Sequence, residues 1–175
     1  MNQIALAVRY YFSQRFAVPA QRAFDWCTDF DPKDYLLMGE ANAKRQISYI
    51  TDATIILTDV FLSESGSIEK QKLVQLYPNR LSWTLTHLTG PNKYSQFLYK
   101  ITAEGKGFSA LNFTALHVGY DEKADVKVLA DRLYKKDAAV WKLLAKTMEE
   151  EQKASLIAVK QTHLKDNEAS YVRRL

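Results

Sequence analysis

Apolar and polar positions alternate over most of the first 120 residues. Between residues 7 and 18, every second position from Tyr10 to Val18 is mostly apolar, and the segment is rich in aromatic and β-branched residues. A period of two is typical of a strand with one buried face. The same pattern, bounded by turn residues, predicts further strands at 47–50, 54–61, 70–77, 81–87, 93–103 and 108–120. Because no helical stretch separates these later strands, we expect an antiparallel meander.

Two short helices are predicted between the first and second strands. Pro19 suits the first turn of a helix, where its missing N–H is not needed. Ala23, Phe24 and Cys27 then form an apolar stripe, and a second short helix is expected over 31–38.

The pattern changes after residue 122. From there to about residue 163 the chain has no Gly or Pro and is rich in Ala, Leu, Lys and Glu, which favours helix. Two carboxylates, Asp137 and Glu151, fall on the apolar stripe of this helix. Either the helix breaks near Lys136, with Asp137 capping a second piece, or the carboxylates face a polar part of the interior. We favour the break.

Length and composition limit the possible architectures. A chain of 175 residues with 47% hydrophobic and 25% charged residues predicts one domain, residues 1–163, followed by a polar tail, residues 164–175. The single cysteine, Cys27, excludes an intramolecular disulfide and a Cys-rich metal site. No run of about 18 apolar residues occurs, so no membrane span is predicted and a cytoplasmic location is expected.

Three short strings and the predicted element order resemble those of the START-like superfamily. They are Phe-Ala-Val-Pro-Ala-Gln-Arg-Ala-Phe-Asp from Phe16, Leu-Tyr-Pro-Asn-Arg from Leu76, and the Gly105-Lys-Gly107 turn. The resemblance covers residues 7–160 and extends to polyketide cyclases and coenzyme-Q-binding proteins. It implies an α+β helix-grip fold, in which a curved antiparallel sheet wraps around the C-terminal helix. Residues 121–136 are long for such a protein and are expected to add a helix over the cavity mouth.

The resemblance also implies an internal cavity that binds a small hydrophobic or amphipathic ligand, such as a lipid, a quinone or a polyketide-like molecule. Side chains that share the inward face by alternation, and helix residues facing them, are the predicted wall. The strand residues are Trp83, Leu85, His87, Phe97, Tyr99, Leu111, Phe113 and His117, and the helix residues are Trp141, Leu144 and Met148.

A cyclase- or dehydratase-like enzyme using the same cavity is the first alternative. His87, His117 and Asp59 all point inward by alternation, and an imidazole or a carboxylate can act as a general base. This alternative requires two of these groups to lie within hydrogen-bonding reach. Otherwise we expect Asp59 to be bonded to a hydroxyl or to water, and we assign no catalytic residue, metal or cofactor.

A second alternative is a protein that associates with RNA, the ribosome or a membrane. The net charge of +4 is mildly basic, and Arg132, Lys135, Lys142 and Lys146 lie along the predicted helix. Asp131 interrupts them, so a solvated helix face is the preferred interpretation. Nucleic acid is not an expected partner, whereas peripheral membrane contact is compatible with the charge.

Overall fold

The computed structural model describes residues 6–40, 42–63, 66–120 and 125–172, with side chains up to residue 158 apart from Ser63. A single turn of 3₁₀ helix, Pro78–Arg80, joins the fourth and fifth strands. The other elements are β1 (Leu6–Phe16), α1 (Ala20–Cys27), α2 (Asp34–Leu37), β2 (Ala43–Thr51), β3 (Thr54–Ser63), β4 (Gly66–Tyr77), β5 (Ser82–His87), β6 (Gln96–Ala103), β7 (Ser109–Gly119) and α3 (Val126–Val172).

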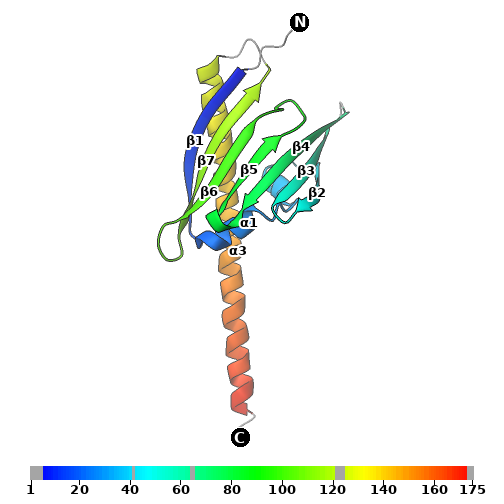
Figure 1. Cartoon of the computed structure of the whole chain (residues 1–175). Coiled ribbons are helices and arrows are strands. Elements are labelled where there is room, and N and C mark those ends of the chain that lie inside the picture. Colours follow the sequence, from blue (N-terminus) through cyan, green and yellow to red (C-terminus); the bar gives the residue numbers. More distant parts are fainter. Residues whose placement is uncertain (1–5, 41, 64–65, 121–124, 173–175) are drawn as a thin grey trace.

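The seven strands form one antiparallel sheet in the order β1-β7-β6-β5-β4-β3-β2. Each strand from β2 to β7 pairs with its neighbour in sequence, which confirms the predicted meander, and β1 closes the order by pairing with β7. The sheet curves across α3, and α1 lies near the point where the helix leaves the sheet (Figure 1). This arrangement is the predicted helix-grip fold.

Alternation along the strands places the core where the sequence predicted it. In β7, the inward side chains of Leu111, Phe113 and Ala115 are at most 2% exposed, while Asn112 between them is exposed. The inward face of β1 contributes Val8, Tyr10, Phe12 and Phe16 to the same core. A period of two therefore identified the buried face of the sheet.

The predicted break in the long helix is wrong, because α3 runs without interruption from Val126 to Val172. The alternative interpretation holds, since both carboxylates on the apolar stripe have polar partners. The Tyr10 hydroxyl donates to Asp137 Oδ2 at 2.5 Å, and the Trp26 indole N–H donates to Glu151 Oε2 at 2.8 Å. Partners from β1 and α1 thus satisfy these groups without any cap in mid-helix.

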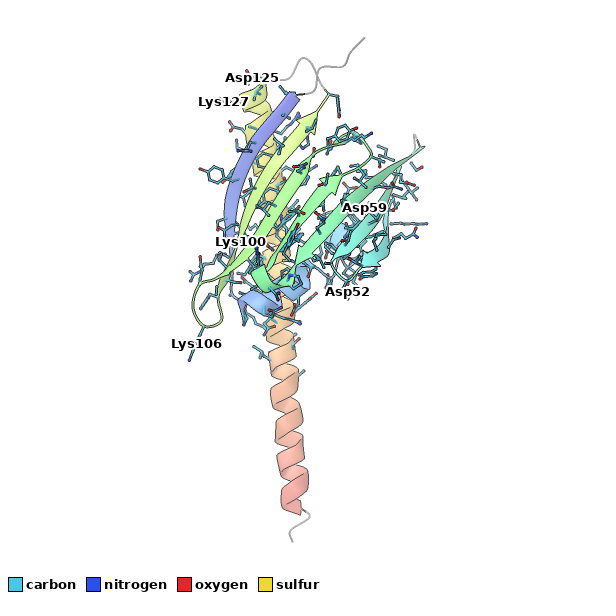
Figure 2. All side chains as sticks on the ribbon, in the orientation of Figure 1. Asp52, Asp59, Lys100, Lys106, Asp125 and Lys127 are labelled. Atoms are coloured by element: carbon cyan, nitrogen blue, oxygen red, sulfur yellow. The ribbon has the colours of Figure 1, made fainter. Side chains whose placement is uncertain are left out.

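The cap lies at the start of α3 instead. Asp125 Oδ1 accepts the backbone N–H groups of Lys127 and Val128 at 2.9 and 3.0 Å, which satisfies two of the unpaired donors of the first turn. Asp125 and Lys127 mark this end of the helix in Figure 2. The added helix predicted over 121–136 is therefore the first part of α3 rather than a separate element, and residues 121–124 lie outside the described part.

The far end of α3 also differs from the prediction. The helix continues past residue 163 to Val172, and its C-terminal half extends beyond the sheet (Figure 1). No Gly or Pro stops it. In this half Leu156 and Ile157 are 53% and 57% exposed. In the described part of the chain, no helix has both the length and the low polarity needed to cross a bilayer.

Candidate functional site

A pocket of about 320 Å³ lies between the inner face of the sheet, α2 and the first half of α3. This volume is at the lower end of the range of small-molecule sites, about 300–1,000 Å³. Leu57 and Leu85 reach it from the sheet, and Leu133 and Val140 reach it from α3.

Nine of the predicted wall residues line this pocket. They are Trp83, Leu85, His87, Phe97, Tyr99, Phe113, His117, Trp141 and Leu144. The other two, Leu111 and Met148, are not part of the lining and are 0% and 1% exposed in the surrounding core. Alternation predicts which face of the sheet a side chain lies on, but not whether it lines the pocket or packs in the core around it. Ligand binding by the nine residues stays a prediction.

An aromatic row crosses the sheet and forms one wall of the pocket. Trp83, Tyr99 and Phe113 are register partners on β5, β6 and β7. The rings of Trp83 and Tyr99 stack with centroids 4.7 Å apart and 3° between their planes, and Phe113 follows at 5.0 Å from Tyr99. Trp141 of α3 contacts Tyr99 from the opposite side at 5.8 Å. The row gives the pocket an apolar, aromatic wall.

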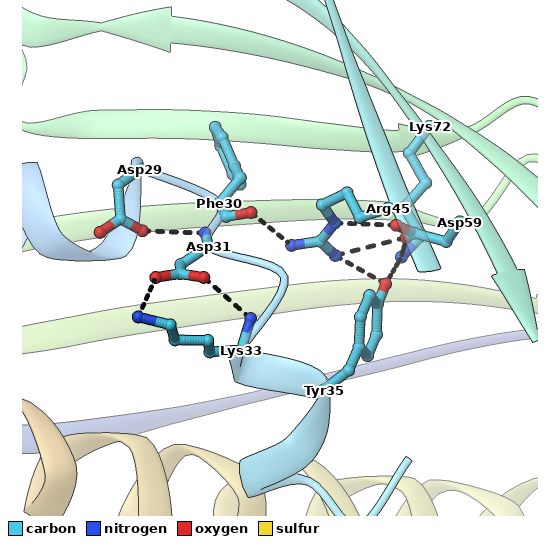
Figure 3. Close-up of polar contacts among 8 residues, drawn as sticks. All are labelled: Asp29, Phe30, Asp31, Lys33, Tyr35, Arg45, Asp59 and Lys72. Atoms are coloured by element: carbon cyan, nitrogen blue, oxygen red, sulfur yellow. Dashed lines mark hydrogen bonds and ion pairs between the residues drawn. The ribbon is translucent and has the colours of Figure 1, made fainter. Parts of the chain in front are cut away.

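A polar cluster made of Arg45, Asp59 and Lys72 lies on β2, β3 and β4. Arg45 donates from Nε to Asp59 Oδ1 at 2.8 Å and from Nη2 to Oδ2 at 3.3 Å, and Lys72 Nζ donates to Oδ2 at 2.5 Å. Asp59 is 0% exposed, whereas Arg45 and Lys72 line the pocket. Figure 3 shows both cations converging on this one carboxylate. The Tyr35 hydroxyl also interacts with Asp59, as expected of a hydroxyl partner, but the two cations that hold its oxygens were not predicted.

The chain between α1 and β2 holds Arg45 in place. Arg45 donates from Nη2 to the Tyr35 hydroxyl at 2.6 Å and from Nη1 to the carbonyl of Phe30 at 3.2 Å. Its guanidinium carbon also lies 4.5 Å from the centre of the Tyr35 ring. Lys72 Nζ reaches the same hydroxyl at 3.4 Å. The short helix α2 thus anchors the cluster to the edge of the pocket.

The charges of the cluster set the protonation of Asp59. Burial alone would raise the pKa of Asp59, but the hydrogen bond from Arg45 and the nearby charge of Lys72 outweigh it and hold that pKa below its usual value. Asp59 therefore stays ionised and is a poor general base. Burial lowers the pKa of Lys72 despite the attraction of Asp59, whereas for Arg45 the bonds to Asp59 and Tyr35 overcome burial and raise the pKa.

A second polar site on the pocket wall joins β1 and α3. Tyr10 and Asp137 both line the pocket, and their side chains share the 2.5 Å hydrogen bond. Burial raises the pKa of Asp137, and the bond from Tyr10 and the charge of Lys136 only partly oppose it. This carboxylate therefore has a stronger tendency to take up a proton than an exposed aspartate.

His87 and His117 line the pocket from β5 and β7. Burial, together with the charges of Lys72 and Lys70, lowers the pKa of His87 to about 4, and burial lowers the pKa of His117 as well. Both imidazoles are therefore neutral at pH 7. In the part of the chain that the structure describes, no hydrogen bond joins any two of His87, His117 and Asp59, and the catalytic alternative stays a prediction. Among the same residues, no three potential His, Cys, Asp or Glu ligands group as a metal site would need.

Sequence reasoning missed Arg45, Lys72 and Tyr35. A signal for the first existed, because an inward aspartate needs cationic partners and the hairpin turn after Thr51 brings Arg45 opposite Asp59. Lys72 shares the inward face of β4 with Val74, which is 0% exposed. The position of Tyr35 depends on how α2 packs, and no sequence pattern gives that.

The basic residues of α3 face solvent. Arg132, Lys135, Lys142 and Lys146 are all exposed, and Lys146 lies 3.9 Å from Glu150 one turn later. This is the arrangement of a solvated helix face. Association with RNA, the ribosome or a membrane stays a prediction.

Solved structures of low sequence identity share this architecture. The aromatase/cyclase Zhui from Streptomyces sp. R1128 superimposes with a TM-score of 0.68 at 12% identity, over 86% of this chain and 98% of the other. Norcoclaurine synthase from Thalictrum flavum, in complex with dopamine and hydroxybenzaldehyde, gives 0.62 at 13% identity over 83% and 88%. Ara h 8.0201 gives 0.58 at 10% identity over 82% and 98%.

No family model matches the sequence, and no curated protein matches it significantly. At 10–13% identity, the likeness to these structures establishes the fold and leaves the ligand and the activity open. The strand order, the long C-terminal helix and these superpositions agree with one another. The chain therefore has a helix-grip fold, similar to that of these solved structures.

Proposed function

We propose that the protein binds a small hydrophobic or amphipathic molecule, such as a lipid, a quinone or a polyketide-like compound, in the pocket between the sheet and α3. The observation that carries this proposal is the composition of the lining, which combines the aromatic row with a few buried polar groups. Ligand pockets are typically built in this way, with apolar area for affinity and placed polar groups for orientation.

Binding would work by removing apolar ligand surface from water. Each Å² so removed stabilises the complex by about 25 cal/mol before the costs of association. The apolar body of the ligand would lie against the row of Trp83, Tyr99 and Phe113, beside the point where Trp141 contacts Tyr99. The polar cluster at one side and Asp137 at another would fix its direction.

The solved relatives support a pocket for small organic molecules. One relative is an aromatase/cyclase, and another was solved in complex with dopamine and hydroxybenzaldehyde. Catalysis is not part of the proposal, because two cations hold Asp59 and, among the described residues, neither histidine is hydrogen-bonded to it or to the other.

Native mass spectrometry of gently purified protein tests the proposal. The wild type should carry an additional small mass that organic extraction removes. Leu85→Trp fills part of the pocket from β5 and should abolish the additional mass. Leu98→Trp makes the same change at a position on β6 that is 45% exposed and outside the pocket lining, and should leave the mass unchanged. Equal retention in both variants would contradict binding in this pocket.

A further inference from the structure

The two cations of the polar cluster are not equally compensated by negative charge. Two buried cations, Arg45 and Lys72, meet a single carboxylate, Asp59. Asp34 also lines the pocket, and its charge interacts with that of Arg45 as well as with the carboxylates of Asp29, Asp31 and Glu151. The charge of Arg45 thus has two acidic neighbours, whereas that of Lys72 depends on Asp59 alone and is opposed by Arg45 and Lys70. Buried charges are normally compensated, and Lys72 is the less compensated of the two.

The hydrogen bonds show the same inequality. Arg45 has five N–H donors and makes four bonds, to Asp59 twice, to Tyr35 and to Phe30. The ammonium group of Lys72 has three donors, and among the described residues its partners are only Asp59 and, at 3.4 Å, the Tyr35 hydroxyl. One N–H of Lys72, on a side chain that lines the pocket, therefore lacks an acceptor within the described chain.

His87 lies beside Lys72 on the neighbouring strand. Lys72 and His87 are register partners on β4 and β5, so their side chains leave the same face of the sheet as nearest neighbours. His87 is 8% exposed, and its Nδ1 has no hydrogen-bond partner in the described chain. A neutral imidazole carries one N–H donor, and this residue also contacts the ring of Phe97 at 5.5 Å. Two polar side chains with unused bonding capacity thus adjoin the apolar wall.

We propose that this pair is the anchor for a ligand carboxylate, with Lys72 supplying the charge and His87 lying alongside as a second polar contact. The inference rests on the proposed function and narrows it to amphipathic organic acids whose apolar body lies against Phe97 and the aromatic row. A carboxylate supplies the acceptor that Lys72 lacks and offsets the surplus positive charge. Charge-assisted bonds of this kind are about twice as strong as neutral ones.

Isothermal titration calorimetry at pH 7 with two probes of the same shape tests this proposal. The probes are 2-naphthoate, which is an anion, and 2-naphthamide, which is neutral. The wild type should bind naphthoate at least about tenfold more tightly, as expected for one hydrogen bond to a charged group. Lys72→Met should remove this preference while naphthamide binding stays within about threefold of the wild type.

Two further variants control the experiment. Lys100→Met removes the same charge from an exposed position on β6, labelled in Figure 2, and should keep the full preference. Lys72→Arg keeps a cation at the anchor and should retain most of the preference, which covers the case in which Lys72→Met fails to fold. Equal affinity of the two probes for the wild type, or equal effects of Lys72→Met and Lys100→Met, would overturn the anchor while leaving the proposed function intact. Failure of both probes to bind the wild type would count against the proposed function itself.

Discussion

Two carboxylates near the pocket, Asp59 behind its wall and Asp137 in its lining, behave in opposite ways. Asp59 lies between two cations and has a lowered pKa, whereas Asp137 has the neutral hydroxyl of Tyr10 as its hydrogen-bond donor and has a raised pKa. Burial acts on both in the same direction, since it disfavours the charged form. The charge of the partner, rather than the depth of the site, therefore decides which carboxylate stays firmly ionised.

The difference separates two roles on one pocket wall. The Arg45–Asp59–Lys72 cluster holds fixed charge and can attract an ionic ligand group. The Tyr10–Asp137 pair holds a carboxylate that accepts a proton more readily, which suits a ligand hydroxyl or amine.

The largest expected effect comes from removing the carboxylate of the cluster. Asp59→Asn leaves two buried cations without a counter-charge and should lower the free energy of unfolding by about 3–5 kcal/mol. Urea denaturation followed by circular dichroism measures the loss. A loss below about 1 kcal/mol would show that Arg45 and Lys72 do not depend on Asp59.

The pH dependence of the free energy of unfolding should show the contribution of His87, which stands beside the cluster. Its pKa is about 4 in the folded protein and about 6.5 in the unfolded chain, so the unfolded chain binds the proton more readily. The contribution of His87 to stability should therefore fall by about 3 kcal/mol as the pH drops from about 6.5 to about 4, and should change no further below that range.

Urea denaturation at several pH values, compared between the wild type and His87→Phe, isolates this contribution. Asp34, with a pKa raised to about 6 mainly by burial, acts in the opposite direction but is common to both proteins. The variant should lose less stability than the wild type over the same range. Parallel curves for the two proteins would contradict the account of His87.

A smaller effect is expected at the second site. Asp137→Asn replaces the charged acceptor of the Tyr10 hydrogen bond with a neutral amide but also removes a charge that burial disfavours, so the net loss should be about 1 kcal/mol or less. Tyr10→Phe should lie in the same range. If Asp137→Asn were as costly as Asp59→Asn, the contrast between the two carboxylates would be wrong.

The smallest effect should come from an ion pair outside the pocket. Arg15 and Glu104 lie 3.0 Å apart with side chains 66% and 43% exposed. Solvent screening leaves such a pair little net value, and Glu104→Gln should change stability by less than about 0.5 kcal/mol. The same urea titrations measure it, and a loss comparable to that of Asp59→Asn would show that burial is not what distinguishes the cluster.

The sequence predicted the sheet well, because the alternation of apolar and polar residues that indicates a strand depends only on residues close together in the chain. Alternation placed Trp83, Tyr99 and Phe113 on one inward face, and the turns separated the strands. Asp137 was misread because a carboxylate on an apolar stripe is a local signal for a cap, while its real partner, Tyr10, is 127 residues away. The end of the long helix was also misplaced, since polar composition alone does not stop a helix.

The polar cluster could not be predicted in full. Arg45, Asp59 and Lys72 come together only when three strands pair in the observed register, and a shift of one residue would turn each side chain to the other face. The inward position of Asp59 was readable from the sequence. The identity of its partners followed from tertiary structure.

Methyl NMR of the wild type during titration with 2-naphthamide tests ligand binding in the pocket most directly, because the probe is neutral and does not depend on the cluster. The account predicts saturable shifts in the methyl groups of Leu85, Val140 and Leu144, which line the pocket, and none in Leu98 or Leu156, which are exposed outside its lining. Shifts confined to the exposed methyl groups, or no saturable shift in any methyl group, would contradict it.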